Sequence, residues 1–319
     1  MKTVLSVIAG AIALACACAP AAAQVSLTTT QIGTGNRLYA EQQDTGAPVS
    51  ATITQIGNNN LAGDPVSHAG GVVQLRSGDV VATLAQTGND NAAGILQDGV
   101  DRSGTSITQV GNGNSGYVRQ RDSGEADNLI EQRGNNNIVN VDQLGVFPFL
   151  TIARQNGNDN NIAVKQVSSG FAGPTIEQTG NLNVALVDQD DAHYSGVTVQ
   201  QVGTANNATV LQKGTMFTTE QTIRQNGNNN LAKADEQGSQ NASRIVQNGN
   251  YNDASTVQRQ NLSEAHIAQT GDSNIARITQ TGSIGAGVLN TASITQIGNG
   301  FNASITQTGS DNHMAIVQH

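Results

Sequence analysis

The sequence predicts an all-β protein: a two-sheet β-solenoid of about twelve stacked strand-turn-strand coils. Three observations lead to this class. A six-residue motif recurs at a nearly fixed spacing. Around it, positions two residues apart carry similar side chains, and large side chains are scarce throughout the chain. A fixed period of this length is typical of repeat proteins, whose units bury their faces only by stacking on neighbours.

The motif is Gln-x-Gly-x-x-Asn, and it occurs twelve times. From Gln86 to Gln201 the copies follow one another every 23 residues, and a second Gln comes 11 residues after the first in most copies. Such regularity predicts that each copy forms one coil. The copies begin at Gln31, Gln55, Gln86, Gln109, Gln132, Gln155, Gln178, Gln201, Gln225, Gln247, Gln269 and Gln307.

On both sides of each motif, apolar or amide side chains recur at every second position. In one copy, Ile107 and Gln109 precede the turn, and Asn114, Val118 and Gln120 follow it. A period of two is that of a β-strand, so these residues are expected to share an inward face. The glycine between the two arms, with Asn, Asp or Gly beside it, predicts a tight turn because such residues tolerate positive φ. Each coil is therefore expected to run strand, tight turn, strand, looser turn.

Stacking would place equivalent residues about 4.8 Å apart, with each Gln or Asn above another. A buried amide without a partner costs about 1–3 kcal/mol, so a continuous hydrogen-bonded ladder is expected to fix the register. The candidate ladder residues are Gln86, Asn91, Gln97, Gln109, Asn114, Gln120, Gln132, Asn137, Gln143, Gln155, Asn160, Gln166, Gln178, Asn183, Gln189, Gln201, Asn206 and Gln212. The tight-turn glycines are Gly88, Gly111, Gly134, Gly157, Gly180 and Gly203.

Composition supports a thin core rather than an ordinary globule. The 319 residues include no Trp, 3% aromatic residues, 12% charged residues and 36 Gly. Disorder is disfavoured because the charge is low and the apolar residues keep a fixed phase.

Residues 1–23 are expected to be a secretory signal peptide, and residues 24–319 the solenoid. Lys2 precedes an apolar stretch from Val4 to Ala19, and small residues end at Ala23. A membrane anchor is disfavoured because the stretch is short and rich in Ala, and a lipoprotein because the residues before Cys16 and Cys18 match a lipobox poorly. Both cysteines of the chain lie in this leader, so the mature chain is expected to form no disulfide.

The mature chain is acidic. Without Lys2 it has 14 basic and 24 acidic residues, a net charge of −10. This charge disfavours nucleic acid as a partner.

The repeat resembles the curlin repeat, Ser-x5-Gln-x-Gly-x-x-Asn-x-Ala-x3-Gln. Ser103, Gln109, Gly111 and Asn114 fit it, with Gly116 where Ala is usual. The chain is thus similar to curlins, the subunits of curli, which are extracellular functional amyloid fibres of bacterial biofilms. The resemblance implies export through a dedicated outer-membrane channel and polymerisation at the cell surface, started by a nucleator subunit.

The chain also departs from the family pattern. It has more repeats than the familiar major subunit, and few residues separate the leader from Gln31. Asp64 to Gly71 forms one apparent insertion, and Gly285 to Leu289 lies in a second. Both are expected to bulge at turns. In the unit at Gln296, Phe301 takes the Asn position.

Aromatic residues recur in the looser turns. Phe171, Tyr194 and Phe217 each follow a second Gln by five residues, and Phe147 and Phe149 bracket the same place one coil earlier. Two interpretations remain open: an aromatic ladder that closes this edge, or a strip for lateral contact between fibres or adhesion.

No residue pattern predicts catalysis, a metal site or a cofactor. The five histidines, His68, His193, His266, His313 and His319, lack metal-ligand spacing. The catalytic and phosphate-binding motifs are absent, and a thin solenoid is not expected to form an active-site pocket.

The first and last repeats resemble interior ones, so both terminal strands are expected to offer unpaired backbone groups to another copy. Head-to-tail stacking does not close and produces a filament. The sequence therefore predicts a secreted, extracellular subunit that assembles into curli-like fibres for biofilm matrix and adhesion. The alternative is a monomeric β-solenoid adhesin or ligand-binding cell-surface protein. An ice-binding solenoid is disfavoured because the residue before each motif Gln varies.

Overall fold

The computed structural model describes residues 2–8, 24–43, 47–63, 71–147, 149–215, 219–282 and 289–319. Every helix or strand in this part of the chain is a β-strand, so the predicted all-β class is confirmed. None of the described residues form a helix long and apolar enough to cross a membrane. The chain divides into two compact units, residues 1–159 and 160–319.

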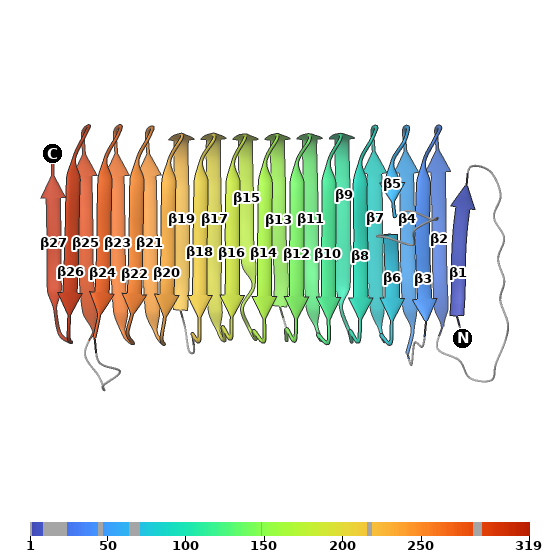
Figure 1. Cartoon of the computed structure of the whole chain (residues 1–319), viewed down its shortest axis with the longest axis horizontal. Coiled ribbons are helices and arrows are strands. Elements are labelled where there is room, and N and C mark those ends of the chain that lie inside the picture. Colours follow the sequence, from blue (N-terminus) through green and yellow to red (C-terminus); the bar gives the residue numbers. More distant parts are fainter. Residues whose placement is uncertain are drawn as a thin grey trace. The chain divides into compact units, whose positions relative to one another are not determined.

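Each unit contains two sheets (Figure 1). We call the sheet whose strands carry the motif glutamines from Gln31 to Gln269 the motif sheet, and the other, which carries the last motif glutamine, Gln307, the return sheet. In unit 1 the motif sheet contains β2 (Val25–Ile32), β4 (Val49–Ile56), β7 (Val80–Thr87), β9 (Gly104–Asn112), β11 (Ala126–Asn135) and β13 (Phe149–Asn158). The return sheet contains β1 (Lys2–Ile8), β3 (Arg37–Gln43), β5 (Leu61–Ala62), β6 (Gly71–Leu75), β8 (Ala92–Asp98), β10 (Ser115–Arg121) and β12 (Ile138–Leu144).

Unit 2 repeats this arrangement. Its motif sheet contains β15 (Pro174–Asn181), β17 (Ser195–Thr204), β19 (Thr219–Asn228), β21 (Asn241–Asn248), β23 (Ser263–Thr270), β25 (Asn290–Ile297) and β27 (His313–Gln318). Its return sheet contains β14 (Asn161–Val167), β16 (Val184–Asp190), β18 (Asn207–Lys213), β20 (Leu231–Gln237), β22 (Asp253–Arg259), β24 (Ile275–Thr281) and β26 (Asn302–Thr308).

Consecutive coils of a unit pair in parallel and keep the sequence repeat in register. On the motif sheet Gln109 lies opposite Gln132, and on the return sheet Gln97 lies opposite Gln120. A tight turn after the motif Gln joins the motif sheet to the return sheet, and a loose turn leads back. The predicted two-sheet β-solenoid of about twelve coils is thereby confirmed. One pair departs from the pattern, because β1 pairs with β3 in antiparallel orientation.

The core between the two sheets is thin, as the composition predicts. Along β9 the side chains of Thr105, Ile107 and Gln109 are buried, whereas those between them are half-buried. Ile130 and Ile223 repeat the position of Ile107 and are fully buried. Each core is therefore one layer of Ile, Val and Ala flanked by rows of amides.

The prediction that the first insertion bulges at a turn is wrong. Residues 64–70 lie outside the described residues, but the short strands on either side both pair with β3: β5 at Arg37 and Leu38, and β6 from Ala40 onward. The insertion thus interrupts a return strand. Gly63 and Gly71 flank the break with φ of 81° and 82°, values that glycine adopts at little cost.

The second insertion lies where the sequence predicts it. Strand β24 ends at Thr281 and β25 begins at Asn290, so the extra residues fall at a loose turn. Of these residues, 283–288 lie outside the described part of the chain.

Candidate functional site: the stacked amides and the turn edges

Two features of the tight turns, a positive φ and the close approach of the next coil, both require glycine. All six candidates, Gly88, Gly111, Gly134, Gly157, Gly180 and Gly203, have φ between 111° and 134°. A Cβ on Gly111 would lie 1.9 Å from the carbonyl oxygen of Gly134 in the next coil, and one on Gly203 would lie 1.9 Å from that of Gly227. The close approach of neighbouring coils therefore leaves no room for a side chain here.

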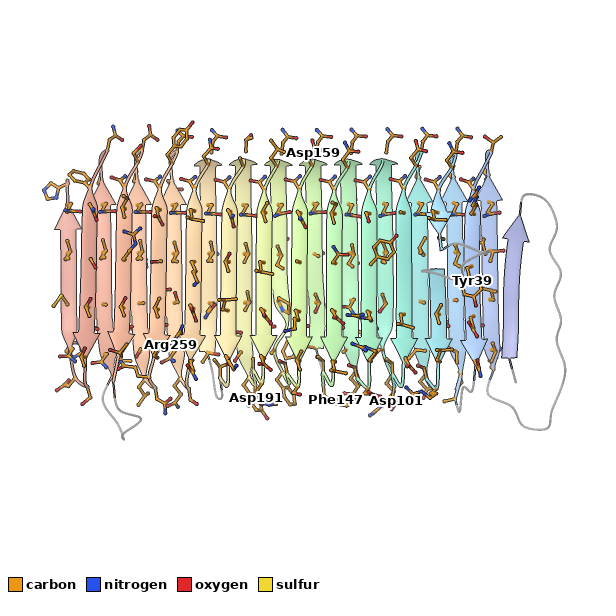
Figure 2. The ribbon with its side chains drawn as sticks, in the orientation of Figure 1. Tyr39, Asp101, Phe147, Asp159, Asp191 and Arg259 are labelled. Carbon is orange, nitrogen blue, oxygen red and sulfur yellow. The ribbon has the colours of Figure 1, made fainter. Side chains whose placement is uncertain are left out.

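The candidate ladder residues are all buried. Their side chains are at most 2% exposed: Gln86, Asn91, Gln97, Gln109, Asn114, Gln120, Gln132, Asn137, Gln143, Gln155, Asn160, Gln166, Gln178, Asn183, Gln189, Gln201, Asn206 and Gln212. Figure 2 shows rows of side chains repeated from strand to strand. Complete burial means that each amide depends on the protein itself for its hydrogen bonds.

The motif glutamines form a hydrogen-bonded row in each unit. Gln86 Nε2 donates to Gln109 Oε1 at 2.9 Å, and Gln109 Nε2 donates to Gln132 Oε1 at 2.8 Å. In unit 2, Gln178 Nε2 donates to Gln201 Oε1 at 2.8 Å. The remaining amide hydrogen also finds an acceptor, as where Gln109 Nε2 donates to the Ala92 carbonyl at 2.9 Å. Within the row itself, each of these glutamines donates to the glutamine of the following coil.

The return-sheet glutamines form a second row, in which the hydrogen-bond partners of the amides differ from coil to coil. Gln97 Nε2 donates to Gln120 Oε1 at 3.1 Å, and Gln189 Nε2 donates to Gln212 Oε1 at 2.7 Å. Gln120 Nε2 donates to the Ala126 carbonyl, and Gln120 Oε1 accepts from Thr105 Oγ1 at 2.8 Å. Polar side chains of the motif sheet thus share the return-sheet amides.

The asparagine row runs in the opposite direction. Asn114 Nδ2 donates to Asn91 Oδ1 of the preceding coil at 3.1 Å, and also to the Gly134 carbonyl of the following coil at 2.8 Å. The Asn114 backbone N–H donates to the same Asn91 oxygen at 3.0 Å. Each asparagine therefore joins three consecutive coils. At Phe301, which takes an Asn position as predicted, the backbone N–H still donates to Asn274 Oδ1 at 3.0 Å.

A serine row on the loose-turn edge was missed by the sequence analysis. Ser77 Oγ donates to the Leu75 carbonyl at 2.8 Å and accepts the backbone N–H of Val100 from the next coil at 3.2 Å. Ser123 and Ser169 make the same kinds of contact. The signal was present in the sequence, because each of these serines is followed by glycine.

Glu236 was also missed. It occupies the second-Gln position of the unit at Gln225, and it lies in register between Gln212 and Gln258. Its side chain is 1% exposed. The row of return-sheet amides in unit 2 is thus interrupted by a carboxyl group.

The outward faces carry charge pairs between neighbouring coils. Arg154 Nε lies 2.9 Å from Glu131 Oε2, and Arg119 pairs with Asp142. Arg259 Nη1 lies 2.6 Å from Asp235 Oδ1. Exposed pairs of this kind contribute about 0–1 kcal/mol each, so they support the register without setting it.

The loose-turn aromatics are exposed, and two of them stack. The rings of Phe171 and Tyr194 have centroids 4.7 Å apart and an interplanar angle of 3°. They are 44% and 53% exposed. Phe147, labelled in Figure 2, belongs to unit 1 and is 53% exposed. Phe217 lies outside the described residues.

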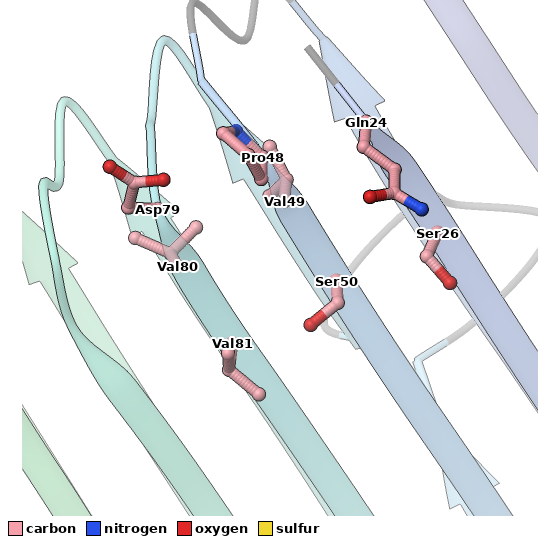
Figure 3. Close-up of a pocket in the computed structure, with 8 residues that line it drawn as sticks. All are labelled: Gln24, Ser26, Pro48, Val49, Ser50, Asp79, Val80 and Val81. Atoms are coloured by element: carbon pink, nitrogen blue, oxygen red, sulfur yellow. The ribbon is translucent and has the colours of Figure 1, made fainter.

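A surface pocket of unit 1 lies at the start of three strands. Figure 3 shows its eight lining residues at the beginnings of β2, β4 and β7. Asp79 is the one ionisable side chain among them, so this pocket contains no acid–base pair. Nowhere in the described ranges do three or more His, Cys, Asp or Glu side chains come together in a group that could hold a metal ion.

The fold and its stacked amides define a class: parallel, two-sheet β-solenoid repeat proteins. Within that class, residues 290–319 match the family model described as the curlin associated repeat. This match confirms the resemblance predicted from the sequence, and the chain carries the curlin repeat. Its repeat and its fold fit a curli-type subunit. A search among curated proteins finds no match to the chain.

Proposed function

We propose that the protein is a secreted structural subunit that assembles with copies of itself into curli-like extracellular fibres. The observation that carries this proposal is the coil-to-coil row of motif glutamines, in which Gln109 donates to Gln132 and Gln178 donates to Gln201. Each glutamine of this row presents the same donor and acceptor to the next coil. A coil from a second copy can therefore continue the row with the same hydrogen bonds.

The strand β27 illustrates how growth would occur. Its inward residues Ile316 and Gln318 are half-buried, whereas Ile294 and Gln296 on β25, opposite them in register, are fully buried. A strand of another copy paired with β27 would bury both side chains and satisfy the backbone groups along that edge. The strand β2, whose Gln31 is also half-buried, offers the matching edge.

The loose-turn aromatics serve lateral contact in this proposal. Phe171 and Tyr194 expose stacked rings that contribute little to the core, since they lie at a turn edge. Exposed aromatic surface of this kind is typical of contact sites between proteins. Fibre bundling or surface adhesion would bury it. A nucleator subunit and an outer-membrane channel remain partners proposed from the family resemblance.

Seeded assembly tests the proposed function. The mature chain, residues 24–319, is diluted from denaturant, and thioflavin T fluorescence is followed with and without preformed fibrils of the same chain. We expect a lag phase that the fibrils abolish, because an existing edge orders the next copy. A soluble monomer that persists in the presence of fibrils would overturn the proposal and favour the monomeric adhesin.

A further inference from the structure

The hydrogen bonds along the return-sheet row of unit 2 all run in one direction, and this direction limits which side chain can stand at position 236. In the two bonds that flank this position, Gln189 Nε2 donates to Gln212 Oε1, and Gln258 Nε2 donates to Gln280 Oε1. The residue between Gln212 and Gln258 must therefore accept from the first and donate to the second. A glutamine can do both, but a carboxylate has no hydrogen to donate.

The buried polar atoms that lack a hydrogen-bond partner around Glu236 match this requirement. Gln212 Nε2, a donor, and Gln258 Oε1, an acceptor, are buried without a hydrogen-bond partner, as are both carboxyl oxygens of Glu236 and both amide atoms of Gln221 on the facing sheet. Gln212 and Gln258 are the two residues that lie opposite Glu236 in register. A carboxylic acid provides one O–H donor and a free acceptor oxygen, which are the groups that the row lacks.

We infer that Glu236 is a protonation switch within the solenoid: the protonated side chain continues the row of amides from Gln212 to Gln258, and the ionised side chain breaks it. When protonated, Glu236 accepts from Gln212 Nε2 and donates its O–H to Gln258 Oε1. When ionised, it places a buried negative charge against the Gln258 oxygen, which is itself an acceptor.

Among the residues that the structure describes around Glu236, no other ionisable side chain points into the core. The inward side chains beside Glu236 are Gln212 on β18, Gln221 on β19, Ser243 on β21 and Gln258 on β22. The charged residues on the return sheet here, Lys213, Lys233, Asp235, Asp253 and Arg259, alternate to the outer face. Those on the motif sheet, Glu220, Arg224 and Arg244, do the same. Nothing inside the core can therefore neutralise an ionised Glu236.

Burial raises the pKa of Glu236 to about 8 from its ordinary value of 4.5. The amides of Gln221 and Gln212 favour the charged form, and the charge of Asp235 opposes it, but neither outweighs burial. Because the folded pKa lies above the unfolded one, this contribution to stability is fully present below about pH 4.5. It declines as the pH rises and is lost once the pH passes about 8.

The test compares the mature chain with three single variants by denaturant unfolding at pH 5 and pH 8.5, with a local probe in unit 2. Glu236→Gln replaces the acid by the residue that the row prefers. Glu220→Gln removes the same charge from an exposed position on β19 and is the matched control. Gln189→Glu places a second carboxyl group in the same row.

We expect Glu236→Gln to resemble the wild type at pH 5 and to unfold less readily at pH 8.5. The ratio of the two unfolding constants should change at least about a hundredfold between these pH values, since one proton changes it by up to about tenfold per unit. Glu220→Gln should keep the pH dependence of the wild type, and Gln189→Glu should increase it. A ratio for Glu236→Gln that is the same at both pH values would overturn the inference. The readout is folding, so it is independent of the proposed assembly.

Discussion

At the scale of single residues, the glycine of each tight turn is required by the neighbouring coil as well as by its own backbone. A Cβ on Gly203 would lie 1.9 Å from the Gly227 carbonyl oxygen, while φ at Gly203 is 120°. By contrast, Gly214 also has positive φ, 56°, but a Cβ there would meet nothing within 4 Å. Substitutions at these two positions therefore separate the free-energy cost of the positive φ from the cost of the steric overlap with the next coil.

We therefore predict that Gly203→Ala destabilises unit 2 by at least about 2 kcal/mol, because the backbone strain and the overlap add. Gly214→Ala should cost less, about 1 kcal/mol, since only the left-handed conformation is strained there. Denaturant midpoints of the two variants measure the difference. Equal losses for both would show that the coils do not approach as closely as described.

A second prediction concerns the asparagine row. Asn183 Nδ2 donates to Asn160 Oδ1 at 3.1 Å and to the Gly203 carbonyl at 2.9 Å, and Asn183 Oδ1 accepts from Asn206 Nδ2 at 3.1 Å. Asn183→Ala leaves several buried groups without partners, so we expect a loss of at least about 2 kcal/mol in the free energy of unfolding. Asn226→Ala, at an exposed position on β19, is the control and should change stability by less than about 0.5 kcal/mol.

Most of the buried positions could be predicted from the sequence because inward residues recur at every second position within each repeat. Once Gln109 and Gln120 are assigned to one repeat, a period of two places Ile107 and Val118 inward as well, and burial follows. The same phase applies to Glu236, which lies 11 residues after Gln225, but its burial was not predicted. A lone carboxylate in a polar chain is usually solvated, and its burial becomes evident only when it is counted at the second-Gln position.

At the scale of elements, the strands and the tight turns follow from the repeat, but the site of an insertion does not. The spacing between Gln55 and Gln86 shows that residues have been added, without showing whether they fall in a turn or in a strand. The structure places them inside a return strand because Ala62 completes one half of the inward pattern and Val72 resumes it. Two flanking glycines with positive φ permit this detour.

The loose turns yield a third prediction. Replacing both Phe171 and Tyr194 by Ser should reduce lateral bundling of fibres, because it removes the exposed stacked rings, while unit 2 loses little stability. Electron microscopy of fibre width, together with a denaturant midpoint, measures both effects. Tyr251→Ser is the control, since Tyr251 is 64% exposed at a tight turn. If folding and bundling decline together, the aromatics instead form a ladder that closes the edge.

At the scale of the whole molecule, one rule repeats in both units: parallel strands pair in register, so that the inward glutamines stack from coil to coil, with Glu236 as the exception on the return sheet. This rule does not distinguish a coil of the same chain from a coil of another copy. The same amides should therefore govern both the stability of each unit and the growth of a fibre.

The most direct test of this claim is the rate of fibril elongation on wild-type seeds for a chain with Gln109→Leu, Asn114→Ala and Gln120→Leu. A chain with Thr108→Leu, Ser115→Ala and Tyr117→Leu is the matched control, because these residues occupy the outward positions of the same two strands. We predict that the inward variant elongates at least about tenfold more slowly than the wild type, a factor equivalent to about 1.4 kcal/mol, and that the control elongates within about threefold of it. Equal elongation rates for the inward variant and the wild type would contradict the claim that the inward amides set the register of assembly.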